Sequence, residues 1–166
     1  MDLHIDDFCG DVARILVNLY AAFPLRHAVY VEDISGPDEP DEVGLHSRRY
    51  EACLGAMLWL AEEGWLRFDS LIYRQGIDQA VLTSRAFLAL SAQSDVRYAD
   101  IPAQPDSVRR AMMTRIEQLR AALKSGESQK ISDVIHYLLS ATPAVLLPET
   151  PELPASTPET DEENGI

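Results

Sequence analysis

The sequence predicts a mainly α-helical protein with one small β-hairpin, two further helices towards the C-terminus and a disordered acidic tail. In four long stretches, apolar residues recur at the three- and four-residue spacing of amphipathic helices. Between the second and third of these, residues 65–82 contain short strand-like segments separated by polar turns. A chain of 166 residues, 46% hydrophobic and 25% charged, can bury one core and is short for two ordinary domains. We therefore expect one main domain.

The first helix is predicted over residues 8–23, because Asp6 or Asp7 can cap its start and Pro24 should end it. Its apolar stripe is Phe8, Val12, Ile15, Leu16, Leu19 and Phe23. Residues 25–31 are predicted to be a short extended segment, and residues 32–36 a single helical turn or a loop. The segment 32–42 holds six acids and no base, which is most simply explained as a solvated loop.

A second long helix is predicted over residues 47–63, with Ser47 as its N-cap and Gly64 at its end. Its apolar stripe is Tyr50, Cys53, Leu54, Met57, Leu58 and Ala61. The opposite face is small and apolar, and consists of Ala52, Gly55, Ala56 and Trp59. Small residues let another helix approach closely, so we expect this face to be covered by the helix 108–123 of the same chain or of a second copy.

A hairpin and a short helix follow. Strand segments are predicted over residues 65–68, 71–73 and 79–82, with a polar tip over residues 74–78. Thr83 can cap a short helix over residues 84–90, whose apolar residues Phe87, Leu88 and Leu90 should point towards the core.

Residues 6–92 carry a resemblance to a known family. The long helix ends in LAEEGWL (residues 60–66), and LTSRAFLAL (residues 82–90) follows the hairpin. This arrangement resembles the winged-helix superfamily of bacterial regulators, in which such a helix leads into the wing and LT with a short helix closes it. The chain departs from the family pattern in an acidic insert over residues 36–44, in Ala86 where LTxxG has glycine, and in a nearly uncharged wing.

The resemblance implies a winged-helix domain over residues 1–92 and a transcriptional regulator that binds duplex DNA as a homodimer. The start of the recognition helix would enter the major groove and the wing would touch the backbone. The residues placed against DNA are His46, Ser47, Arg48 and Arg49 at base edges, and Arg74 and Gln75 near phosphates. Arginine reads guanine well, although two arginines in the first turn of an exposed helix are more commonly solvated or paired with neighbouring acids such as Asp41, Glu42 or Glu51.

The charge of the chain points to a second hypothesis. The net charge is −13, and residues 142–166 carry six acids and no base. DNA-binding proteins usually attract phosphate with a basic surface. The alternative is therefore an acidic winged-helix protein–protein interaction module, an adaptor or accessory subunit, whose loop 32–42 or acidic tail meets a basic protein partner instead of DNA.

Residues 105–141 are predicted to be a helical region for packing or dimerisation. One helix should contain the stripe Val108, Met112, Ile116, Leu119 and Leu123, and end at Gly126. A second should start at Ser128 and end before Pro143. The segment 105–130 is basic, and could touch phosphate, clamp the acidic loop of a partner subunit or simply be a charged outer face. Residues 142–166, rich in proline and acids, are predicted to be disordered.

Neither catalysis nor a cofactor is expected. The four histidines are scattered, and Cys9 and Cys53 lack a second ligand at zinc-site spacing. His4, Asp6, Asp7 and Cys9 are close in sequence, but a frayed N-terminus followed by a helix cap explains them more simply than a metal does. Without a signal peptide or an apolar run long enough to span a membrane, the expected location is the cytoplasm.

Overall fold

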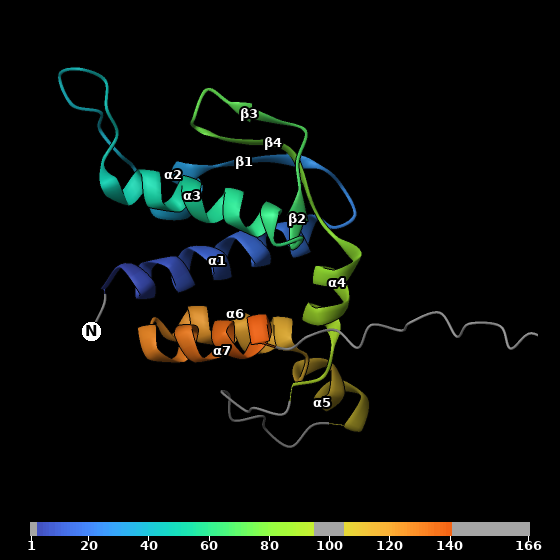
Figure 1. Cartoon of the computed structure of the whole chain (residues 1–166). Coiled ribbons are helices and arrows are strands. Elements are labelled where there is room, and N and C mark those ends of the chain that lie inside the picture. The colour runs from blue at the N-terminus through green and yellow to red at the C-terminus, as the bar shows by residue number, and fades with distance from the viewer. Residues whose placement is uncertain (1–2, 95–104, 141–166) are drawn as a thin grey trace, which may run out of the picture.

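The computed structural model describes residues 3–94 and 105–140. Over these residues the protein is mainly helical, with seven helices and a small antiparallel sheet of four strands (Figure 1). The described residues contain no helix that is both long and apolar enough to cross a membrane.

Helix α1 (Leu3–Ala22) is the centre of the core and starts before the predicted Phe8. Figure 1 shows α1 between α3 and the sheet on one side and α6 and α7 on the other. Because both sides are covered, α1 carries an unusually wide buried surface, and six of its apolar residues are no more than 1% exposed: Cys9, Val12, Ala13, Ile15, Leu16 and Leu19.

The predicted helices around residues 47–63 and 84–90 are confirmed. Helix α3 (Arg48–Glu62) starts after Ser47, whose side chain accepts a hydrogen bond from the Tyr50 amide, and Gly64 follows its end with a φ of 74°. Helix α4 (Ser84–Ser91) is capped in the same way by Thr83.

The sheet is built around β4 (Gly76–Leu82), with β1 (His27–Tyr30) and β2 (Leu66–Arg67) antiparallel on its two sides and β3 (Ser70–Ile72) paired with its first residues. The returning strand therefore begins three residues earlier than the predicted residue 79. A side chain at Gly76 would place its Cβ 2.2 Å from the Val29 carbonyl oxygen. Only glycine lets β1 pass this close to β4.

Helix α2 (Val31–Ser35) follows β1 directly and buries Val31 and Ile34. The segment that could have been a turn or a loop is therefore one short helix. Residues 36–47 then connect α2 to α3, and Figure 1 shows this connection projecting away from the body of the protein.

Two expectations about apolar faces were wrong. Leu88 is 63% exposed, because it lies about 100° around the helix from Phe87, which stacks on Phe23 with ring centroids 4.6 Å apart. The small face of α3 is only partly covered, and by α1 instead of by residues 108–123: Trp59 packs edge-on against Phe8 of α1, at 5.3 Å between centroids, whereas Ala52 and Gly55 are exposed.

The single helix predicted over residues 108–123 is two helices, α5 (Asp106–Met112) and α6 (Arg115–Ser125). The break occurs because the backbone groups of Met113 and Arg115 form hydrogen bonds with the segment that follows α4. The Ser94 amide donates to the Met113 carbonyl at 2.7 Å, and the Arg115 amide donates to the Ala92 carbonyl at 2.9 Å. The described part of residues 105–141 thus holds three helices, where two were predicted.

Helix α7 (Ser128–Ser140) confirms the last predicted helix, and Gly126 ends α6 in the left-handed conformation. Helices α6 and α7 pack against each other and against α1, and their apolar residues belong to the same core as those of α3 and the sheet. The C-terminal helices therefore complete the main domain. The tail predicted to be disordered, residues 142–166, lies outside the described residues.

Candidate functional site

Arg49 is partly exposed and is paired with a carboxylate of the same chain. Its two terminal nitrogens donate to the two carboxylate oxygens of Asp11 on α1, each at 2.6 Å, and the Asp11 side chain is only 1% exposed. The partner of Arg49 is thus Asp11, not one of the neighbouring acids Asp41, Glu42 or Glu51, because Arg49 begins the stripe of α3 that continues through Cys53 and Ala56 towards α1. Arg49 and Asp11 are one structural ion pair.

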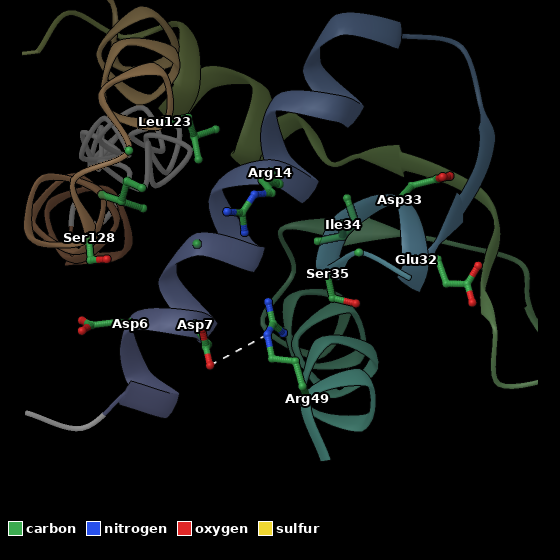
Figure 2. A pocket seen from close by; sticks show the side chains of 14 residues that line it. Asp6, Asp7, Arg14, Glu32, Asp33, Ile34, Ser35, Arg49, Leu123 and Ser128 are labelled. Carbon is green, nitrogen blue, oxygen red and sulfur yellow. Dashed lines mark ion pairs between the residues drawn. The ribbon is translucent and has the colours of Figure 1, made fainter. Parts of the chain in front are cut away.

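Figure 2 shows the hollow beside this pair, between α1, α2 and the turn that joins α6 to α7. Its volume is about 710 Å³. Arg14 and Arg49 point into it, while Asp7 lies 3.8 Å from Arg49 and Asp11 lies 3.7 Å from Arg14. Each arginine in the hollow is thus near a carboxylate, so neither is a free positive charge.

The other residues predicted to meet DNA are also largely engaged within the protein. His46 stacks on Tyr50 at 3.9 Å between ring centroids, and Ser47 caps α3. Arg74 donates to both carboxylate oxygens of Glu51 at 2.8 Å. Arg48 and Gln75 are exposed, and Arg48 forms no ion pair with any residue that the structure describes.

The five residues predicted to pack or dimerise are divided by the break before α6. On α5, Val108 and Met112 are 42% and 37% exposed. On α6, Ile116 and Leu119 are buried, and Leu123 packs partly buried against the core.

The acidic connection of residues 36–47 is largely exposed, in agreement with the solvated loop predicted over residues 32–42, and it is also organised by hydrogen bonds. Asp41 accepts hydrogen bonds from the amides of Val43 and Leu45, at 3.0 and 2.8 Å. Asp38 accepts from the Ser47 amide at 3.3 Å and lies 2.9 Å from the His46 ring nitrogen Nδ1. Hydrogen bonds from Ser47 and His46 hold the pKa of Asp38 below its usual value.

This loop presents two apolar side chains to solvent. Val43 is 81% exposed and Leu45 is 66% exposed. Because the Asp41 carboxylate accepts hydrogen bonds from the backbone amides of both residues, the two exposed side chains are attached to an ordered backbone.

The tip of the β3–β4 hairpin is a second exposed feature. Tyr73 and Arg74 have φ values of 40° and 63°, and the Gln75 amide closes the turn by donating to the Ile72 carbonyl at 2.6 Å. Two-residue turns with positive φ normally contain glycine or asparagine. This turn instead has Tyr73, a bulky aromatic residue that is 93% exposed.

A smaller pocket of about 210 Å³ lies between the loop and this hairpin tip. Its lining residues are Tyr30, Glu32, Asp33, His46, Tyr50 and Gln75. The Tyr50 residue is 2% exposed, and its ring stacks on that of His46 with the centroids 3.9 Å apart. Burial raises the pKa of Tyr50, and the nearby charges of Glu32, Asp38 and Glu51 raise it further.

Within the described residues, no three histidine, cysteine or acidic side chains are grouped so that they could hold a metal. The two thiols are buried. Burial raises the pKa of Cys9, and raises that of Cys53 to about 12. Neither cysteine has the lowered pKa that an activated nucleophile needs.

One feature of the sequence could have predicted the ion pair between Asp11 and Arg49. Asp11 stands between Gly10 and Val12 inside an apolar helical run, and a carboxylate at such a position requires a partner when it is buried. By contrast, the turn at Tyr73 and Arg74 lacks the glycine or asparagine that would have indicated positive φ.

Comparisons with protein-family models, curated proteins and solved structures found no match to this chain.

Proposed function

We propose that this chain is a non-catalytic winged-helix protein of the cytoplasm, and that it works as an acidic interaction module for a basic protein partner. The element order α1–β1–α2–α3–β2–β3–β4 and the sheet order β1–β4–β2 support the winged-helix assignment. The contact surface, called the loop–wing face, consists of the loop 36–46 and the hairpin tip 71–75. The free, buried thiols support a reducing compartment.

The observation that carries this proposal is Tyr73. A non-glycine residue at positive φ costs on the order of 1 kcal/mol. With its side chain 93% exposed, Tyr73 gains almost no packing within the chain in return. Exposed tyrosines are frequent anchors of protein interfaces, because they bury a large apolar area at a small entropic cost. A partner that covers Tyr73 explains why this residue occupies the turn.

The loop adds a second, independent argument. Val43 and Leu45 are exposed on a backbone that is already fixed by Asp41. Ordering a loop before binding lowers the entropic cost of association. The exposed acids Glu39 and Glu42 lie in the same loop, so a partner with basic side chains around an apolar patch is the complementary surface.

The same geometry disfavours DNA at this face. Arg49 is bound to the buried Asp11 carboxylate, so releasing Arg49 would oppose phosphate or base contact. The pair of Arg74 with Glu51 is exposed and opposes such a contact only weakly. The acids of the loop stand directly before α3 and would repel the phosphate backbone.

DNA binding as a homodimer is the second candidate. It is favoured by Arg48, which is exposed in the first turn of the helix that occupies the recognition position. Half-exposed Val108 and Met112 on α5 could contribute to a contact between two copies. This candidate requires mixed genomic duplex fragments to be retained at low salt, with steep release as salt is added and loss of retention in Arg48→Ala.

The proposed function is tested by affinity capture from the cells that make the protein. We expect one or more basic proteins to bind the tagged wild-type chain, and to be lost with Val43→Asp combined with Leu45→Asp. The matched control is Leu25→Asp combined with Leu88→Asp, which changes two residues that are 72% and 63% exposed outside the loop–wing face. If the same proteins bind all three forms equally, the loop does not contact them and the proposal fails.

A further inference from the structure

Helix α5 exposes every one of its seven residues, Asp106–Met112. Val108 and Met112 are four residues apart, so they lie on one side of the helix, and they are 42% and 37% exposed. An isolated helix shorter than about 12–15 residues is only marginally stable in water, and helices in proteins are normally held by packing of their apolar side. The apolar side of α5 is therefore a surface that the described part of the chain leaves uncovered.

Basic side chains border this apolar side. Arg109 and Arg110 lie between Val108 and Met112 in the sequence, and α5 and α6 together contain five basic residues and two acids. Arg109 lies 4.0 Å from Asp106 in an exposed pair, which is a weak interaction. Arg110 makes no ion pair with any residue that the structure describes. The surface called the α5 face consists of Val108, Arg109, Arg110 and Met112.

The loop 36–46 is the complementary surface on this chain. It presents Val43 and Leu45 to solvent from an ordered backbone, with the exposed acids Glu39 and Glu42 in the same loop. Each of the two surfaces thus has two exposed apolar residues beside two charges, and the charges are of opposite sign. Figure 1 shows the loop and α5 at opposite ends of the structure, so the loop of one chain cannot reach its own α5.

We propose that the α5 face of one copy of this chain binds the loop 36–46 of a second copy. The inference rests on the proposed function, because it uses the same loop, and it adds a second copy of the chain as one occupant of the loop–wing face. The contact is heterologous, since two different surfaces meet, and each pair of copies still has one free loop and one free α5 face. Association therefore proceeds head to tail, and the small area of each surface makes it weak and dependent on concentration.

Sedimentation equilibrium of the full chain tests the contact with two variants, each of which removes one surface. The loop variant carries Val43→Asp with Leu45→Asp, and the α5 variant carries Val108→Asp with Met112→Asp. All four positions are exposed, so the core stays intact and the circular dichroism of both variants should match that of the wild type. The salt concentration is about 0.15 M, at which repulsion between two acidic chains is screened beyond roughly 8 Å.

The average mass of the wild type should rise with concentration, whereas each variant alone should remain monomeric. An equimolar mixture of the two variants should form a one-to-one complex and no larger species. The reason is that the loop variant supplies the only intact α5 face in the mixture, and the α5 variant supplies the only intact loop.

The charges are tested by a swap that keeps the apolar residues. Arg109→Glu with Arg110→Glu should raise the Kd for a wild-type loop by at least about tenfold. Glu39→Lys with Glu42→Lys in the opposing loop should restore the affinity, because the signs of the facing charges are again opposite.

Leu25→Asp with Leu88→Asp is the matched control, since these residues are 72% and 63% exposed elsewhere, and it should associate as the wild type does. Self-association of either variant alone would show that one surface meets its own copy, and would overturn the head-to-tail contact. A mixture that stays monomeric would overturn it too. If the chain does not associate and the amide signals of α5 change when residues 142–166 are deleted, the α5 face is occupied by the chain's own C-terminal segment.

The capture experiment separates this inference from the proposed function. The α5 variant retains the loop, so it should still capture basic proteins as the wild type does. Captured proteins without self-association would reject the contact with α5 and keep the proposed function. Self-association with no other protein captured would keep the contact and reject the basic protein partner.

Discussion

Arg49 and Arg48 are neighbours in sequence with opposite surroundings, and this contrast gives the sharpest prediction at the scale of single residues. Arg49→Ala leaves the Asp11 carboxylate buried without its main partner, so it should lower the free energy of unfolding by about 2–3 kcal/mol, somewhat less than for a fully buried pair because Arg49 is partly exposed. Arg48→Ala should change it by less than about 0.5 kcal/mol. Urea unfolding measures both, and equal effects would show that the pair with Asp11 contributes no stability.

The strain at Tyr73 predicts a substitution that stabilises the protein. Asparagine tolerates positive φ better than tyrosine, so Tyr73→Asn should raise the free energy of unfolding by roughly 0.5–1 kcal/mol. The same variant should bind the partner less tightly. A loss of stability in thermal or urea unfolding would mean that the tyrosine ring supports the fold, and the main argument for the loop–wing face would fall.

The two thiols are predicted to be inert in the folded protein. Since the pKa of Cys53 is raised to about 12 and that of Cys9 is also raised, both stay protonated at neutral pH, where the reactive species is the thiolate. Reaction with a disulfide reagent at pH 8 should be at least about a hundredfold slower in the native state than in urea. A rapid native reaction of either cysteine would contradict the buried environments described above.

At the scale of elements, the helices that the sequence predicted well are those with local signals. Ser47 and Thr83 cap α3 and α4, and Gly64 and Gly126 mark helix ends. The break between α5 and α6 was missed, because it depends on two hydrogen bonds between distant segments, from the Ser94 amide to the Met113 carbonyl and from the Arg115 amide to the Ala92 carbonyl. Periodicity alone continues through such a break, so the two helices were predicted as one.

The position of α7 against α1 predicts that the C-terminal helices are part of one folding unit. Ile135 is fully buried, so Ile135→Ala should cost about 2–5 kcal/mol, whereas His136→Ala on the exposed side should cost less than about 0.5 kcal/mol. Unfolding followed by tryptophan fluorescence, which reports on Trp59 and Trp65, should shift together with circular dichroism. Separate transitions would indicate that α7 belongs to an independent dimerisation region.

At the scale of the whole molecule, the net charge of −13 already favoured a basic partner, and the structure adds the form of the contact surface. The sequence predicted an acidic loop but not that the loop is ordered. The order comes from Asp41 and Asp38, which accept hydrogen bonds from backbone amides whose positions cannot be inferred from the sequence. The candidate arginines were assigned by resemblance to a family that binds DNA. Their pairing with Asp11 and Glu51 depends on contacts between elements distant in the sequence.

The central claim is that the loop–wing face meets protein and not DNA, and photo-crosslinking tests it most directly. A photoreactive phenylalanine analogue replaces Tyr73 in the cells that make the protein, with Leu88 as the matched exposed position on α4. The account predicts an adduct from position 73, absent from position 88, that withstands nuclease, is destroyed by protease and contains a basic protein. A nuclease-sensitive adduct at position 73, or equal protein adducts from both positions, would contradict it.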